Sequence, residues 1–318
     1  MDQVILITLI ILTYTFQSLF SKMYTVNYPG DKAYAPNVFT IVSGIVVAIT
    51  ALCFAGFSFG PFRWDTLILG VINAIVLYCY NEFIIKGSTT GDYSILVVFN
   101  IGGGIVIPAI INPLFFGESF MVTQLVAIVI IFVAVYLVSY KKAETTEGEE
   151  QKKSKALHII VCTLLAIANG AYAVVLKAQE YLNASSATPD PTQSQLLLVY
   201  TFAGAALISA ISLVIRKKGE TLSVFRQTKK SLVFLILAAI VAAIAPNILV
   251  ITLGAVNSTL LYTFNNAGVM LFSALASAFI FREKLSKLNI IGCAIMTVAL
   301  VLMGGSSVIE GFLAGLLA

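Results

Sequence analysis

Charged side chains are scarce in this sequence. Only 11% of its 318 residues are Asp, Glu, Lys or Arg, whereas a soluble domain has about 25%. Apolar residues make up 59% of the chain, and the mean hydropathy is +0.98. So few charges cannot cover a soluble core of this size. The net charge of +4 is small and the basic residues lie between apolar runs, so composition does not favour nucleic-acid binding either.

Metal-binding and catalytic patterns are also missing. The single histidine, His158, is isolated, and no two of the four cysteines form a Cys-x-x-Cys pair. A metal site or a disulfide framework is therefore not expected. The sequence has no nucleophile elbow, no zinc-protease helix and no phosphate-binding Gly-rich loop. We expect neither enzyme activity nor a bound cofactor.

Long apolar runs dominate what remains. A helix needs about 20 mostly apolar residues to span a bilayer, and ten runs qualify: 3–22, 36–57, 66–86, 93–116, 120–140, 156–178, 194–216, 231–253, 257–281 and 287–305. Helices are expected because lipid cannot satisfy exposed backbone N–H and C=O groups. The sequence thus predicts an all-α, multi-pass membrane protein with ten transmembrane helices, in the inner or plasma membrane of a cell.

A charged linker divides these helices into two groups of five. The predicted organisation is a five-helix repeat at 1–140, the linker at 141–155, a second five-helix repeat at 156–305 and a C-terminal tail at 306–318. Five is an odd number, so the second repeat must enter the membrane from the opposite side. The two repeats are therefore predicted to be inverted, as in many secondary transporters.

The two halves also match in sequence. An offset of 165 residues aligns Phe99–Asn100 with Phe264–Asn265, and it continues without a gap across two helices and their turn. The Phe-Asn match and the Phe-x-Glu match in the turn are hard to obtain by chance among apolar residues. This agreement supports an internal repeat.

Basic residues indicate the orientation. Of the 19 Lys and Arg residues, 17 lie in or next to loops that follow odd-numbered helices, and the other two are Arg63 and Lys177. Lys and Arg concentrate on the cytoplasmic side of membrane proteins. The linker is therefore predicted to be cytoplasmic and both termini external.

An aromatic-x-Glu turn closes the fourth helix of each half, at 116–120 and at 281–285. With ten helices and a five-plus-five inverted repeat, these turns resemble the EamA-type members of the drug/metabolite transporter superfamily. The resemblance implies export of metabolites, amino acids or drugs, or exchange of sugar phosphates or nucleotide sugars. EamA-type members often carry Glu-Pro about fourteen residues before the turn glutamate, whereas positions 104–105 and 269–270 hold Gly-Ile and Val-Met. The chain therefore resembles a divergent branch, and its external termini also depart from many members.

Polar side chains inside a bilayer are costly, so those within the runs are candidates for function. Asn100 and Asn265 are repeat-equivalent and are predicted to line a substrate cavity. The alternative is an interhelical hydrogen bond that only packs helices together. Further substrate-binding candidates within the runs are Gln17, Asn81, Asn247 and Tyr262.

Charged residues in the runs suggest a coupling or charge site. Glu82 could pair with Lys22 or titrate as a proton-coupling group. Lys22 and Lys177 end the first and sixth runs. They could contact an anion, or they could extend their ammonium groups to the membrane surface.

A glycine run in the fourth helix suggests a hinge. The residues are Gly102, Gly103, Gly104 and Pro108. Glycine permits close backbone approach, and proline removes a helical hydrogen bond. The alternative is tight helix packing.

These features together favour a secondary transporter that moves a small organic solute by alternating access. The solute is predicted to bind near the bilayer midplane, between helices 1–4 and 6–9. The expected partners are this solute, the lipid bilayer and coupled protons, with no nucleic acid. The fifth and tenth helices are expected at the periphery, where they could form a homodimer contact. The alternative is a non-transporting membrane scaffold or receptor-like protein.

Overall fold

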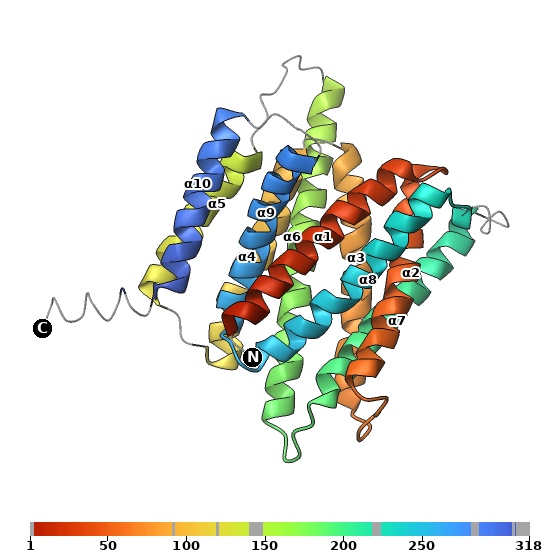
Figure 1. The fold of residues 1–318 in the computed structure, drawn as a ribbon, viewed down its shortest axis with the longest axis vertical. Helices are drawn as coiled ribbons and strands as arrows, with labels where there is room; N and C mark the ends of the chain where they lie inside the picture. Colours follow the sequence, from red (N-terminus) through yellow and green to blue (C-terminus); the bar gives the residue numbers. More distant parts are fainter. Residues whose placement is uncertain are drawn as a thin grey trace, which may run out of the picture. The chain divides into compact units, whose positions relative to one another are not determined.

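The computed structural model describes residues 3–90, 93–118, 121–139, 149–217, 224–280, 286–306 and 309. Within these ranges the chain is all-helical and contains no strand (Figure 1). The helices are α1 (Gln3–Asn27), η1 (Lys32–Tyr34), α2 (Ala35–Phe54), α3 (Trp64–Thr90), α4 (Tyr93–Phe116), α5 (Val122–Ser139), α6 (Glu149–Ala184), α7 (Thr192–Lys217), α8 (Lys229–Leu253), α9 (Ser258–Ile280) and α10 (Lys287–Gly304).

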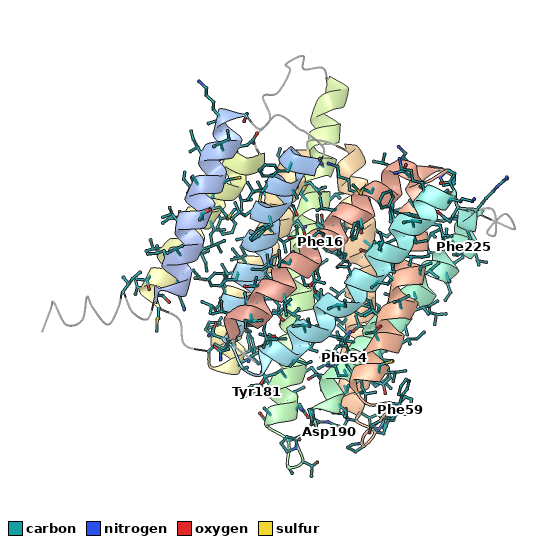
Figure 2. The ribbon with its side chains drawn as sticks, in the orientation of Figure 1. Phe16, Phe54, Phe59, Tyr181, Asp190 and Phe225 are labelled. Carbon is teal, nitrogen blue, oxygen red and sulfur yellow. The ribbon has the colours of Figure 1, made fainter. Side chains whose placement is uncertain are left out.

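Eight helical spans of the described chain are long and apolar enough to cross a membrane. They lie in α1, in η1 with α2, and in α3, α4, α6, α7, α8 and α10, whereas the apolar part of α5 is shorter, at Val122–Leu137. Large apolar side chains are exposed along them, including Phe16 of α1 and Phe54 of α2 (Figure 2). An exposed apolar surface of this extent needs lipid around it. The prediction of an all-α, multi-pass integral membrane protein is confirmed at this level.

Local sequence explains where two of these helices begin. Thr228 and Ser231 form a reciprocal capping box at the start of α8. Ser286 and Asn289 form another at the start of α10. In each box a side-chain oxygen accepts a hydrogen bond from a backbone N–H that the first helical turn leaves without a partner.

The chain packs as two compact units, and each takes helices from both halves of the sequence. The first unit comprises Met1–Ile85 and Ala171–Val256, and the second comprises Lys86–Gly170 and Asn257–Ala318. These units differ from the predicted sequence repeats, 1–140 and 156–305, because a repeat follows chain order whereas a packing unit follows which helix faces meet. The linker residues 141–148 lie outside the described part, and α6 already begins at Glu149.

In the first unit α1 packs against α8, and α2 packs against α7 and α8 (Figure 1). The α1–α8 pair is antiparallel, since Gln3 Nε2 donates to Ala255 O at 2.9 Å and the Tyr28 hydroxyl donates to Val224 O at 2.5 Å. The α2–α7 contact is so close that a Cβ on Gly44 would lie 2.7 Å from the carbonyl oxygen of Phe202. Glycine is therefore needed at this crossing.

In the second unit α5 packs against α10, and α4 packs against α9. The core of this unit consists of small and medium apolar residues from these four helices, with Ile131, Ala134, Met296 and Ala299 fully buried. Small residues let membrane helices approach closely, which is how they gain packing energy without a hydrophobic driving force.

Candidate functional site

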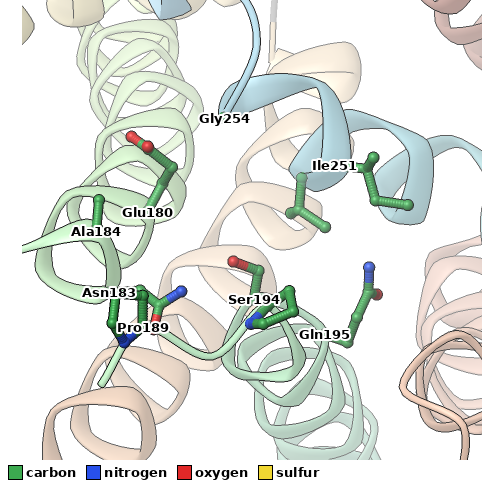
Figure 3. Close-up of a pocket in the computed structure, with 10 residues that line it drawn as sticks. Glu180, Asn183, Ala184, Pro189, Ser194, Gln195, Ile251 and Gly254 are labelled. Atoms are coloured by element: carbon green, nitrogen blue, oxygen red, sulfur yellow. The ribbon is translucent and has the colours of Figure 1, made fainter. Parts of the chain in front are cut away.

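A pocket of about 370 Å³ lies at one end of the first unit. It is bordered by the C-terminal ends of α6 and α8, the start of α7 and the α6–α7 loop (Figure 3). This volume is at the small end of the range for ligand pockets. Its lining residues are Glu180, Asn183, Ala184, Pro189, Pro191, Ser194, Gln195, Val250, Ile251 and Gly254.

Glu180 carries a negative charge into this pocket. Its Oε2 accepts a hydrogen bond from Lys177 Nζ at 2.6 Å, one helical turn earlier on α6. The Lys177 side chain is only 11% exposed and that of Glu180 is 22% exposed. A largely buried lysine needs such a counter-charge because desolvating an ammonium alone is costly.

Hydrogen bonds from the α2–α3 loop fix the wall formed by the α6–α7 loop. Asn183 Oδ1 accepts from Arg63 Nη1 at 3.2 Å and from the backbone N–H of Asp190 at 3.1 Å. Asp190 in turn accepts from the backbone N–H and the hydroxyl of Thr192, at 2.9 and 2.8 Å. These hydrogen bonds hold the loop against the α2–α3 loop and the end of α6.

These contacts shift the pKa values of two charged side chains, Asp190 and Arg63. The hydrogen bond from the Thr192 N–H lowers the pKa of Asp190, helped by nearby Arg63. The hydrogen bonds to Asp65 raise the pKa of Arg63. Both groups therefore stay charged around neutral pH and keep the loop network intact.

Gln195 contributes a buried acceptor to the same pocket. Its side chain rises from α7 toward Ile251 of α8 (Figure 3), and the residue is only 5% exposed. Its Oε1 accepts no hydrogen bond from any residue that the structure describes. An unsatisfied buried acceptor is costly, so this amide oxygen needs a donor from outside the described residues or a functional reason to remain without one.

A polar seam joins α3 to α7 along the length of the first unit. Its hydrogen bonds connect Thr66 with Gln193 at 2.8 Å, Asn73 with Thr201 at 3.3 Å, Tyr78 with Ser212 at 2.9 Å and Glu82 with Arg216 at 2.7 Å. On α3 the four residues follow one another at spacings of seven, five and four residues, so the hydrogen bonds to α7 recur along most of the helix. Of these residues, only Glu82 was a functional candidate from sequence.

Glu82 forms an ion pair with Arg216, whose side chain is 42% exposed, while that of Glu82 is 25% exposed. Asn37 Nδ2 also approaches Glu82 Oε1, at 3.5 Å. The sequence suggested Lys22 as a partner for this carboxylate. Lys22 is exposed near the end of α1, as expected of a side chain that extends to the membrane surface.

The other predicted residues of the first unit are Gln17, Asn81 and Asn247. Asn81 Nδ2 donates to Thr40 Oγ1 of α2 at 2.8 Å. Asn247 is fully buried, and its Nδ2 donates to Ala243 O one turn earlier at 2.6 Å. Asn81 thus makes an interhelical hydrogen bond, whereas Asn247 Oδ1 and Gln17 Oε1 are buried acceptors without a donor among the described residues.

In the second unit, two asparagines from other helices converge on the glycine run of α4. Asn169 of α6 donates from Nδ2 to the backbone oxygen of Asn100 at 2.7 Å. Asn266 of α9 donates to Tyr262 O at 2.9 Å and to Gly104 O at 3.4 Å. Pro108 has no N–H, so Gly104 O lacks its usual donor four residues later. Asn266 supplies that missing hydrogen bond.

The glycine run serves close packing in this structure. A Cβ on Gly103 would lie 2.1 Å from Ala166 O of α6, and one on Gly102 would lie 2.8 Å from a ring carbon of Phe132 in α5. A Cβ on Gly104 would meet the amides of Asn169 and Asn266, at 2.7 to 2.9 Å. α4 runs as one continuous helix through this segment and Pro108, so its contacts fit the tight-packing alternative to a hinge.

Asn265 and Tyr262, both predicted to bind substrate, also lie in the second unit. Tyr262 is buried, with 3% exposure. Asn265 Oδ1 is buried and accepts no hydrogen bond from the residues that the structure describes. The predicted site residues are therefore divided: Asn100, Tyr262, Asn265 and the glycine run belong to the second unit, whereas Gln17, Lys22, Asn81, Glu82, Lys177 and Asn247 belong to the first.

The first aromatic-x-Glu turn has a structural role. Glu118 accepts hydrogen bonds at the start of α9, from the N–H of Ser258 at 3.0 Å, and from the N–H and hydroxyl of Thr259, both at 3.3 Å. A carboxylate at this position also interacts favourably with the helix dipole. Residues 119–120 and the second turn at 281–285 lie outside the described part of the chain.

Comparisons with known proteins bear on the fold alone. No protein-family model matches this sequence, and no curated protein is significantly similar to it. Chains of solved structures do match, 29 in number. One, described only as the crystal structure of a protein, has a TM-score of 0.69, is 13% identical, and aligns over 94% of this chain and 95% of its own. At that identity the likeness shows a shared fold.

Proposed function

We propose that this chain is a secondary transporter that moves a small organic solute across the membrane by alternating access. The observation that carries the proposal is the solute-sized pocket at the ends of α6, α7 and α8, with a carboxylate and an unsatisfied buried amide oxygen in its wall. A membrane protein that only packs its helices has no need to maintain such costly groups.

The unsatisfied acceptors elsewhere in the spans support the same proposal. Gln17 Oε1, Asn247 Oδ1 and Asn265 Oδ1 are all buried, and none accepts a hydrogen bond from a residue that the structure describes. A polar solute that passes these groups could supply the missing donors. Gln17 and Asn247 belong to the first unit and Asn265 to the second, so each unit contains such an acceptor.

We further propose that the chain is a divergent member of the drug/metabolite transporter superfamily, with ten spanning helices in two inverted five-helix repeats. The helix pairing supports this. If the halves are equivalent, α2 corresponds to α7, α4 to α9 and α5 to α10, and each of these pairs is in contact. Contact between equivalent helices is expected where a pseudo-two-fold axis passes between them. A cytoplasmic 141–155 linker and external termini follow from the distribution of basic residues.

Proton coupling is proposed for Glu82, whose carboxylate lies within a membrane span and pairs with Arg216. Replacing Glu82 by Gln should abolish solute uptake driven by a pH gradient and preserve solute exchange, because exchange requires no net proton movement. Asp31→Asn, which changes an exposed carboxylate of the same unit that caps η1, is the matched carboxylate control. Unchanged pH-driven uptake in Glu82→Gln would remove this residue from the mechanism.

The proposal can be tested with purified protein in liposomes. A defined mixture of small amines, zwitterions, sugars and carboxylates is offered outside, and the trapped solutes are quantified by mass spectrometry. We expect saturable accumulation of at least one solute above protein-free liposomes, and weaker accumulation with Asn265→Leu. If correctly inserted protein accumulates none of them, the non-transporting scaffold becomes the better account.

A further inference from the structure

We infer that the pocket at the ends of α6, α7 and α8 selects a small solute that carries an ammonium group, bound at Glu180, with a second hydrogen-bond donor facing Gln195. The inference rests on the proposed function, since it names the chemical class of the solute that is transported. Binding to the pocket can nevertheless be measured separately from transport.

Charge favours an ammonium group. Among the described residues that line the pocket, Glu180 alone is charged. Lys177 is nearby, but its ammonium is engaged by Glu180 Oε2. A carboxylate can accept about four hydrogen bonds over its two oxygens, so Glu180 can hold Lys177 and a second cation together. An anionic solute would meet the carboxylate directly and be repelled.

The amide oxygen of Gln195 favours a solute with a second hydrogen-bond donor. Gln195 Oε1 is buried and receives no hydrogen bond from the described residues. Gln195 extends from α7, whereas Glu180 lies on α6, across the pocket (Figure 3). One ligand group would not reach both, so a hydroxyl or an N–H at the far end of the solute would satisfy the amide oxygen.

The remaining walls are mostly apolar. Pro189 and Pro191 come from the α6–α7 loop, and Val250 and Ile251 come from α8. These side chains would contact a compact hydrocarbon body between the two polar ends. Asn183 adds little acceptor capacity, because its Oδ1 already accepts from Arg63 and from the Asp190 N–H. The pocket therefore suits an amphiphilic amine of a few carbon atoms.

Three probes built on one cyclohexane ring test this assignment, namely trans-4-aminocyclohexanol, cyclohexylamine and cyclohexanol, and cyclohexanecarboxylate is the anionic control. Binding to the detergent-solubilised full chain is measured by calorimetry and by thermal stabilisation at pH 7.5, where both amines are protonated. We expect cyclohexylamine to bind at least about tenfold more tightly than cyclohexanol, and trans-4-aminocyclohexanol more tightly still. Equal affinities for all three, or tighter binding of cyclohexanecarboxylate, would overturn the inference.

Variants assign each preference to one residue. Glu180→Gln should remove the preference for cyclohexylamine over cyclohexanol, and Gln195→Leu should remove only the additional gain from the hydroxyl. Because Glu180→Gln leaves the buried Lys177 without its counter-charge, the double variant Lys177→Met/Glu180→Gln is tested alongside and should show the same loss. Asp31→Asn changes an exposed carboxylate of the same unit that caps η1 and should alter neither preference. An ammonium preference that persists in the double variant refutes the assignment.

Failure of this inference and failure of the proposed function give different results. If the probes show the expected preferences but the liposomes accumulate no solute, the pocket assignment holds and transport is wrong. If the liposomes accumulate solutes without preference for amines, and the probes bind equally, transport holds and the pocket assignment is wrong.

Discussion

Replacing Asn266 by Ala is expected to destabilise the second unit by about 1 kcal/mol. The side chain donates to Gly104 O, which Pro108 leaves without its usual helical donor, and to Tyr262 O. Interhelical hydrogen bonds in membranes contribute about 0.6 kcal/mol to stability on average and about 1.7 kcal/mol at most. Because the Asn266–Gly104 hydrogen bond is long, at 3.4 Å, we expect its contribution to lie near the average. Losing a donor to a buried carbonyl adds a desolvation cost.

A double-mutant cycle separates this role from general packing. In a Pro108→Ala background the N–H of residue 108 can donate to Gly104 O, so Asn266→Ala should then cost less than about 0.5 kcal/mol. Asn265→Ala, at the neighbouring position, is the matched control and should have the same effect in both backgrounds.

The free energy of unfolding is measured by circular dichroism as a denaturing detergent is titrated into mixed micelles. The two backgrounds should differ for Asn266→Ala and agree for Asn265→Ala. If Asn266→Ala costs the same with and without Pro108, the asparagine does not replace the missing helical hydrogen bond.

Three further predictions concern packing, function and pH. Gly103→Ala should lower the free energy of unfolding by about 3 kcal/mol or more, because its Cβ would lie 2.1 Å from Ala166 O. The control is Gly254→Ala, whose Cβ would have no neighbour closer than 4.0 Å and which should leave the free energy of unfolding nearly unchanged in the same titration. Asn265→Leu should keep or raise stability, because it removes an unsatisfied buried acceptor, yet lower solute uptake by liposomes at least about tenfold; a variant that is destabilised and transports normally would contradict this. The lowered pKa of Asp190 means that its carboxylate stabilises the fold above about pH 4 and that this contribution is lost as the pH falls through the lower folded value. Asp190→Asn should therefore lower the melting temperature more at pH 7 than at pH 3, and an equal difference at both pH values would refute it.

Fold class could be predicted from composition because a bilayer leaves a chain few alternatives to helices. The ends of the helices were harder to predict from the sequence. The sixth helix was predicted at 156–178 but spans Glu149–Ala184, since polar residues at either end can continue a helix beyond the apolar core of the membrane. The two packing units could not be predicted either, because which faces of the helices meet depends on contacts that no local pattern records.

For the candidate site, the sequence indicated charged residues but not their partners. Lys177 stood out within an apolar run, whereas Glu180 lay just beyond the predicted end of that run. Their spacing of three residues could have suggested an ion pair on one helix. Arg216 lies far from Glu82 in sequence and meets it only because α3 and α7 run side by side. Gln195 gave no signal, since its importance comes from burial without a donor.

The most direct test of transport is solute counterflow in proteoliposomes. Vesicles are loaded with a high concentration of one unlabelled solute from the mixture, and entry of the labelled solute at low concentration is followed over time. A transporter that alternates access carries unlabelled solute out and labelled solute in, so we predict transient accumulation of label above its equilibrium level in loaded vesicles. Label that never exceeds equilibrium, for every solute tested with correctly inserted protein, would contradict the account.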